Sequence, residues 1–167
     1  MYNQLTEKDI KAMEAEIEER KLVLRPKLLE DVKEARAHGD LSENFEYYAA
    51  KKEKNNNESR IRFLERMIKT AEIIPDDSAE DEIGMNTRVT VMFEEDGETE
   101  TYKIVTTMRG DSLSGLVSVE SPIGKALMGH KEGDKVYVEV NAGYGYYLTV
   151  KKIEKNLNEK EEKLRNF

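Results

Sequence analysis

The chain has 167 residues, with 27 Lys and Arg against 35 Asp and Glu, which gives a formal net charge of −8 at pH 7. This balance excludes a general binder of DNA or RNA, because phosphate would be repelled unless a local patch reversed the sign. Only 38% of the residues are hydrophobic and 7% are aromatic. Such a lean composition favours two small units or one elongated unit over a single large core.

The chain contains no cysteine. Disulfides, thiol nucleophiles and thiolate metal sites are therefore excluded, and the absence suits a reducing compartment. The first twenty residues are highly charged and lack the apolar run of a secretory signal, and no stretch approaches the roughly 18 apolar residues of a membrane span. We expect a cytoplasmic protein that does not contact a membrane.

Residues 1–74 have a helical pattern and carry almost no net charge, with 15 basic and 16 acidic side chains. Apolar or small residues recur at spacings of three, four or seven, as on one face of a helix. In the first arm they are Ile10, Met13, Ile17, Leu24, Leu28, Val32 and Ala35. In the second arm they are Phe45, Tyr48, Ala49, Phe63, Met67, Thr70 and Ile74. The pattern predicts two long helices.

The break between the arms predicts a tight turn. Gly39 is suited to a left-handed helix end, and Ser42 can cap the next helix. A short connection makes the two helices antiparallel neighbours in a hairpin roughly 40 to 45 Å long. We expect polar residues in the middle of the second helix (Lys52, Asn55, Asn56 and Ser59) to set the register, and Pro26 to add a local kink.

Residues 75–153 have a different character, with 8 basic and 15 acidic side chains and nine of the ten glycines. A linker at residues 75–82 leads into residues 83–153, where β-type segments alternate with Gly-containing turns. The five segments are 87–93, 99–106, 116–119, 135–140 and 146–153. A short helix follows Ser121, with Pro122 in its first turn and Gly129 beyond its end. We predict a small antiparallel sheet with one helix, followed by a charged tail at residues 154–167 that forms a frayed helix.

Most catalytic constellations are absent, and the turn of the hairpin holds the main candidate site. Asp40 and Glu43 lie three residues apart, so both carboxylates can point outward from the end of a long rod. Mg²⁺ is bound by such oxygen ligands, although two carboxylates alone make an incomplete site. The alternative is that Asp40 caps the turn and Glu43 interacts with the helix dipole.

Basic residues follow behind this acidic turn, at Lys33, Arg36, Lys51 and Lys52. They form either a solvated face or a patch that contacts phosphate.

Two sequence motifs resemble those of a known family. Residues 34–44 read EARAHGDLSEN and residues 46–51 read EYYAAK, which closely resembles the tip motif of the bacterial GreA/GreB transcript cleavage factors, GreA above all. Residues 121–129 read SPIGKALMG and are followed by Gly133 and Asp134, which resembles the C-terminal signature of that family. The resemblance covers about residues 4–153. Phe45 and Tyr48 depart from the residues that are common in the family, and the tail after Ile153 extends beyond its usual end.

The resemblance implies an α+β protein, with an N-terminal coiled-coil hairpin and a C-terminal domain of FKBP-like fold. It also implies that the chain binds bacterial RNA polymerase, inserts the hairpin through the secondary channel and stimulates cleavage of backtracked RNA, without being an enzyme itself. DNA binding is a further property that the resemblance suggests.

By the same resemblance, Asp40 and Glu43 act in the polymerase active site and share a second Mg²⁺ with the polymerase. Arg36, Lys51 and Lys52 are implied to contact the 3′ end of the nascent RNA. Ser121, Pro122 and Ile123 are implied to dock on the polymerase. We expect a monomer.

Three other functions compete with this one. A regulator of the same fold could occupy the channel and inhibit transcription without stimulating cleavage, although the intact carboxylates argue against it. An FKBP-like domain also suggests a peptidyl-prolyl isomerase. Such an enzyme needs a pocket lined by aromatic side chains, for which the candidates are Tyr102, Tyr137, Tyr146 and Tyr147. The last alternative is a coiled-coil interaction protein with no further activity.

Overall fold

The computed structural model describes residues 3–39, 44–75, 77–155 and 162–167. The chain divides into two compact units. One is formed by residues 8–71, and the other combines residues 1–7 with residues 72–167. None of the helices in the described ranges is long and apolar enough to cross a membrane.

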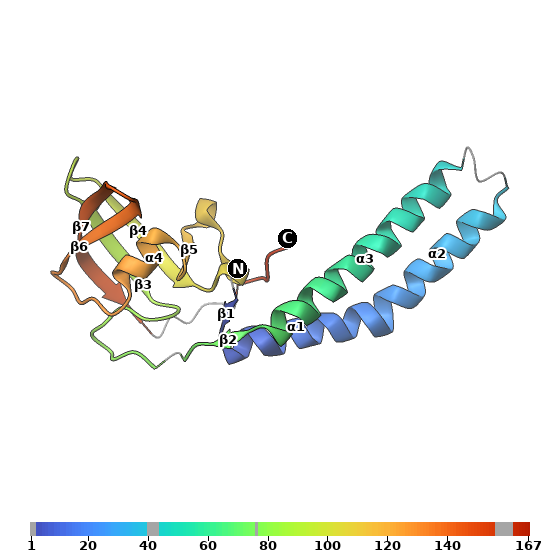
Figure 1. The fold of residues 1–167 in the computed structure, drawn as a ribbon, viewed down its shortest axis with the longest axis horizontal. Helices are drawn as coiled ribbons and strands as arrows, with labels where there is room; N and C mark the ends of the chain where they lie inside the picture. The colour runs from blue at the N-terminus through green and yellow to red at the C-terminus, as the bar shows by residue number, and fades with distance from the viewer. Residues whose placement is uncertain (1–2, 40–43, 76, 156–161) are drawn as a thin grey trace. The chain divides into compact units, whose positions relative to one another are not determined.

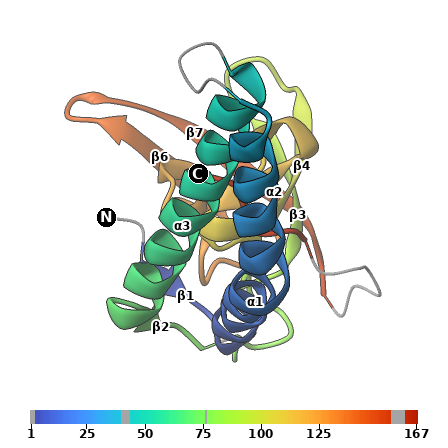
Figure 2. The ribbon, with the colours of Figure 1, turned by 90° about the vertical axis from the view of Figure 1, so that its right-hand side faces the viewer.

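The first unit is a helical hairpin. Its first arm consists of α1 (Glu7–Glu19), a π-helical segment η1 (Arg20–Leu24) and α2 (Arg25–Ala37), and its second arm is α3 (Phe45–Lys69). Figure 1 and Figure 2 both show α2 and α3 running side by side. The two predicted helices are therefore confirmed.

The irregular segment of the first arm lies directly before Pro26, where the sequence predicted a disturbance. Proline has no N–H to donate, and its ring collides with the carbonyl four residues earlier in a regular helix. The structure accommodates it with a wider turn, in which the Arg25 N–H donates to the carbonyl of Arg20, five residues back. Pro26 then lies in the first turn of α2, where a missing N–H is tolerated.

The buried face of the first arm follows the predicted stripe, with Met13, Leu28 and Ala35 buried. The prediction for the tip-proximal part of α3 was wrong, because Phe45 and Tyr48 are 84% and 51% exposed. The α3 seam is instead a heptad-like series in which spacings of three and four alternate. Its buried or half-buried members are Tyr47, Ala50, Lys54, Asn57, Ile61 and Leu64.

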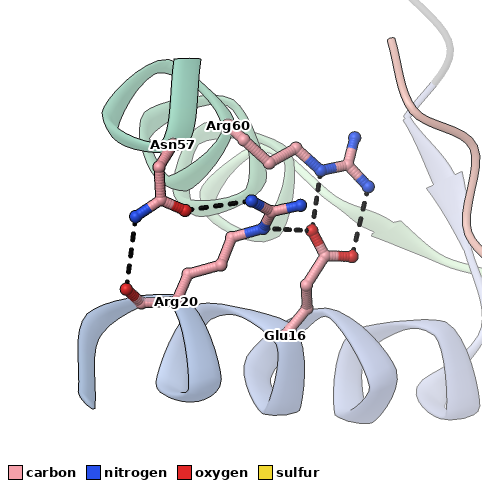
Figure 3. A network of polar contacts seen from close by, with 4 residues as sticks. All are labelled: Glu16, Arg20, Asn57 and Arg60. Atoms are coloured by element: carbon pink, nitrogen blue, oxygen red, sulfur yellow. Dashed lines mark hydrogen bonds and ion pairs between the residues drawn. The ribbon is translucent and has the colours of Figure 1, made fainter. Parts of the chain in front are cut away.

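A polar network occupies the middle of the hairpin seam (Figure 3). Glu16 accepts two hydrogen bonds from Arg60, at 2.8 and 3.2 Å, and one from Arg20 at 2.8 Å. Arg20 also donates to Asn57 Oδ1 at 2.9 Å, while Asn57 Nδ2 donates to the Arg20 carbonyl at 3.3 Å. The network links residues 37 to 44 positions apart in the chain, so a shift of one arm along the other would break it.

The sequence therefore predicted polar residues in the seam but named the wrong ones. Lys52, Asn55, Asn56 and Ser59 are exposed, whereas Asn57 and Arg60 are buried. The error arises because a run of polar residues has no apolar marker to show which of them faces the other helix. Which polar residues face the first arm depends on their partners there, Glu16 and Arg20.

The second unit contains a mixed sheet of five strands in the order β5-β4-β3-β7-β6. The strands are β3 (Arg88–Phe93), β4 (Thr99–Val105), β5 (Leu116–Ser118), β6 (Lys135–Asn141) and β7 (Tyr144–Glu154). The predicted small sheet is confirmed, but β5 pairs with β4 in parallel, contrary to the expectation of a wholly antiparallel sheet. The connection between the parallel strands β4 and β5 contains two 3₁₀ turns, η3 (Thr107–Arg109) and η4 (Ser112–Ser114).

The core of this unit lies on one face of the sheet. Val89, Val91, Val138, Leu148 and Val150 are fully buried there. The predicted short helix, α4 (Pro122–Leu127), contributes Leu127 to the same core. A separate pair of two-residue strands, β1 (Gln4–Leu5) and β2 (Glu72–Ile73), is parallel.

The end of the chain differs from the prediction. β7 continues to Glu154, and residues 162–167 contain no helix. The predicted frayed helix is therefore absent from the described part of the tail.

Candidate functional site

The turn of the hairpin is anchored by Asn44. The predicted carboxylates Asp40 and Glu43 lie outside the described residues, as does Ser42, the predicted cap. Asn44 caps α3 instead, because its Oδ1 accepts a hydrogen bond from the backbone N–H of Tyr47 at 3.0 Å. Its Nδ2 donates to the Ala35 carbonyl near the end of α2, at 2.6 Å. One side chain thus ties the end of the first arm to the start of the second.

Tyr47 is the centre of the described tip. It is only 8% exposed, and the sequence analysis did not single it out. Its hydroxyl accepts a hydrogen bond from Arg36 at 3.4 Å, and the Arg36 guanidinium lies 5.5 Å from the ring centroid. The hydrogen bond from Arg36, together with the charges of Lys51 and Lys54, lowers the pKa of Tyr47. The spacing of three to Ala50 and seven to Lys54 was the signal that could have identified it.

Two of the three predicted RNA-contacting residues meet at this tyrosine. Lys51 Nζ lies 6.0 Å from the centroid of the Tyr47 ring, on which Arg36 also stacks. Cation–π contacts of this kind hold long basic side chains in place. Lys52 is exposed on α3 and makes no such contact with Tyr47 in the described part of the tip. We call Arg36, Lys51 and Tyr47 the tip cluster.

The two residues that depart from the family pattern lie on the exterior of the tip. Phe45 and Tyr48 are exposed, and the Tyr48 ring contacts Tyr47 edge-on with centroids 5.4 Å apart. Nearby, His38 Nδ1 lies 3.0 Å from a Glu46 carboxylate oxygen, so the residue directly after α2 contacts the first turn of α3.

The described residues do not by themselves form a metal site. Among them there is no group of three or more His, Asp or Glu side chains that could hold a metal ion.

The predicted docking residues lie at the start of α4, and each has a different environment. Ser121 caps the helix, since its Oγ accepts from the Gly124 N–H at 3.1 Å and donates to the Ser118 carbonyl at 2.6 Å. Ile123 packs partly against the core. Pro122 is exposed in the first turn. Of the three, Pro122 is the residue whose surface is most available to a partner.

Gly124 explains why the α4 motif needs a glycine. A Cβ at this position would lie 2.0 Å from the Ser118 carbonyl oxygen and 3.0 Å from Val119 Cα. Because both neighbours are backbone atoms, any larger residue would push α4 away from the end of β5.

The four tyrosines considered for an isomerase pocket lie on two faces of the sheet. Tyr102 and Tyr146 pack against the core, whereas Tyr137 and Tyr147 are exposed. Tyr137 and Tyr147 pair across β6 and β7, next to the buried pair Val136 and Leu148, and therefore lie on the opposite face of the sheet. This arrangement does not favour the isomerase alternative.

Comparisons with known proteins agree with the two-unit organisation. Residues 3–73 match a family model described as "Transcription elongation factor, N-terminal". Residues 78–155 match one described as "Transcription elongation factor, GreA/GreB, C-term". The two matches account for the hairpin and for the unit with the five-stranded sheet.

Similar curated proteins include transcription elongation factors GreA from two streptococci. The protein of Streptococcus gordonii is 46% identical over 86% of this chain and 89% of its own length. That of Streptococcus sanguinis is 44% identical over 92% of this chain and 96% of its own length. Nothing in these matches supports DNA binding.

Similar solved structures include GreA factor homolog 1 of Thermus thermophilus, with a TM-score of 0.42 and 26% identity over 92% of this chain and 99% of that one. Another is the elongation factor GreA/GreB of Nitrosomonas europaea, with a TM-score of 0.39 and 22% identity over 56% of this chain and 78% of that one. The two family models and the identity to the streptococcal proteins together show that the chain belongs to the GreA/GreB family of transcription elongation factors.

Proposed function

We propose that this chain binds RNA polymerase, passes its hairpin through the secondary channel and stimulates Mg²⁺-dependent cleavage of backtracked RNA. It is not an enzyme itself, because factors of this family stimulate a cleavage activity that the polymerase already has. The observation that supports the proposal best is the hairpin. α3 alone has 25 residues, which at about 1.5 Å per residue is roughly 38 Å.

The chemistry at the tip depends on carboxylates from this chain. Asp40 and Glu43 supply hard oxygen ligands, which suit Mg²⁺, and we propose that the polymerase provides the remaining ligands. A second Mg²⁺ held between the two proteins stabilises the attacking and leaving oxygens during phosphodiester cleavage. Asn44 follows Glu43 directly and fixes the chain to both arms, so it holds the position at which the loop ends.

A backtracked elongation complex tests the carboxylates. With Mg²⁺ and the wild-type protein, we expect the RNA to be shortened from its 3′ end. Asp40→Asn with Glu43→Gln should still bind the polymerase but lower the cleavage rate at least about a hundredfold, the range reported for losing a key catalytic contribution. Glu34→Gln, on the exposed surface of α2, is the matched control and should cleave normally.

The same assay distinguishes a cleavage factor from a regulator that only occupies the channel. A protein that only occupies the channel would bind and leave the RNA intact in both the wild type and the double variant. Equal cleavage by the two proteins would instead show that the tip carboxylates have no part in the reaction.

We further propose that Arg36, Lys51 and Lys52 contact the extruded RNA 3′ segment by charge. The tip cluster supports this for Arg36 and Lys51, because both cationic groups lie beside the Tyr47 ring, 5.5 and 6.0 Å from its centroid. Contacts to phosphate position the nucleic acid without reading its sequence.

Charge reversal at single positions tests whether Lys51 contributes more to RNA contact than Lys52. Lys51→Glu should lower crosslinking of the tip to the RNA 3′ end more than Lys52→Glu does, because Lys51 is the one of these two lysines that lies beside the Tyr47 ring. Both variants should bind polymerase as the wild type does. Equal crosslinking by wild type and both variants would mean that the lysines form only a solvated face.

Docking on the polymerase is proposed for Ser121, Pro122 and Ile123, with Pro122 as the contacting surface. We also propose that the protein acts as a monomer in the cytoplasm, where its polymerase partner acts.

A further inference from the structure

The described end of the chain, residues 162–167, lies against the second unit. Lys103 Nζ is 2.5 Å from Glu162 Oε1, and the two side chains are only 6% and 15% exposed. Arg109 Nη1 donates a hydrogen bond to the backbone carbonyl of Glu162. The backbone N–H of Arg165 donates to the Met108 carbonyl at 2.6 Å.

These contacts have the form of peptide recognition. One acidic side chain is held by a lysine, and two main-chain groups are held by an arginine side chain and a backbone carbonyl. Extended segments are commonly bound by this combination of a charged anchor and main-chain hydrogen bonds. The segment itself forms no helix or strand, and residues 163 and 165–167 are exposed.

The charges of the receiving surface suit an acidic ligand. With the tail in place, Lys103 on β4 and Arg109 in η3 are 5% and 6% exposed, in a part of the chain that has 15 acidic and 8 basic residues. A buried cation is costly without an anionic partner. Lys103 and Arg109 both contact Glu162 of the tail, which gives a carboxylate oxygen to Lys103 and its backbone carbonyl to Arg109.

The η3 turn that contains Arg109 is also hydrogen-bonded to the segment before α4. The Thr107 hydroxyl, in η3, donates to a Glu120 carboxylate oxygen at 2.9 Å and lies 2.5 Å from the Ser118 hydroxyl. Ser118 in turn accepts from Ser121. These hydrogen bonds hold η3, which contains Arg109, against the start of α4.

We propose that Lys103, Arg109 and the Met108 carbonyl form a docking site for an extended protein segment that carries an acidic side chain, and that residues 162–165 occupy this site as a built-in competitor. A partner segment gains access when the tail leaves. The proposal does not depend on transcript cleavage, because it concerns only the second unit and the tail.

The site can be tested with the tail as its own probe. A fluorescently labelled synthetic peptide of residues 156–167 is titrated with the full chain and with a chain that ends at Lys155, and binding is followed by anisotropy. The tethered tail competes at a high effective concentration, so the shortened chain should bind the peptide at least about tenfold more tightly. A scrambled peptide of the same composition, and one with Glu162→Lys, should each bind at least about tenfold more weakly.

A second variant tests the same contact without truncation, in case the shortened chain does not fold. The full-length chain with Glu162→Lys keeps the tail but removes its anchor, so it too should bind the wild-type peptide more tightly than the unmodified chain. In the shortened chain, Lys103→Gln should abolish binding, whereas the exposed Lys135→Gln should not. If neither the shortened chain nor the full-length Glu162→Lys variant binds the peptide, or if the scrambled peptide binds equally, the tail contact is structural only and the proposal is wrong.

Discussion

Glu16 illustrates how much of the hairpin depends on single charged side chains. Burial by itself raises the pKa of Glu16, but the hydrogen bonds and charges of Arg60 and Arg20 outweigh it and lower the pKa below its ordinary value. Arg60 is 7% exposed, and its guanidinium also stacks on Phe63 with 5.5 Å to the ring centroid. Removing Glu16 would leave a nearly buried cation without its anion.

Glu16→Gln should therefore destabilise the hairpin by about 1–2 kcal/mol at pH 7, a value reduced for the partial exposure of the site. A carboxyl whose pKa is lowered by folding stabilises above its unfolded pKa, and this stabilisation is lost as the pH falls through the folded value. The difference between wild type and variant should thus shrink below about pH 4.5, the ordinary value of the group. Urea unfolding followed by circular dichroism from pH 7 to pH 3 measures it.

Glu14→Gln is the matched control, since Glu14 is exposed on the same helix. It should change stability little at any pH. A pH-independent difference between wild type and Glu16→Gln would contradict an ionised, hydrogen-bonded Glu16.

At the scale of elements, the turn of the hairpin depends on one side chain that acts on two helices. Asn44 satisfies the Tyr47 N–H at the start of α3 and donates to the Ala35 carbonyl at the end of α2, which also accepts from the His38 N–H at 3.2 Å. Each helix end leaves such groups without intrahelical partners, so a residue that serves both ends also limits how the arms can separate.

Asn44→Ala should lower the stability of the hairpin by about 1–2 kcal/mol, because both hydrogen bonds are lost. It should also slow transcript cleavage while every carboxylate is retained, since the loop that carries Asp40 and Glu43 would lose its fixed end. Unfolding curves and the cleavage assay measure the two effects. Asn55→Ala, at an exposed position within α3, should be neutral or slightly stabilising, and a similar loss there would refute the capping argument.

At the scale of the whole molecule, the division into two compact units predicts that binding and cleavage can be impaired separately. Pro122→Asp places an acidic residue in the first turn of α4, where the helix dipole tolerates it, so the fold should persist. If Pro122 contacts the polymerase, the concentration needed for half-maximal cleavage should rise several-fold, with the cleavage rate at saturation unchanged.

The tip variant Asp40→Asn with Glu43→Gln should show the reverse, with normal binding and lost cleavage. Glu95→Gln, in the exposed turn between β3 and β4, serves as the control for Pro122→Asp. A parallel loss of saturating rate in Pro122→Asp would mean that the second unit contributes to more than docking.

The sequence alone determined the two long helices, the β-rich second unit, the short helix after Ser121 and the family. These features depend on local periodicity, on helix-start residues such as Pro122 and on contiguous motifs, all of which are visible within a few turns of chain. Only the tertiary structure decided that Asn57 faces the seam, that β5 joins β4 in parallel and that Glu162 lies on Lys103. Each of these depends on partners far along the chain, and a local pattern contains no information about which distant residue will lie opposite.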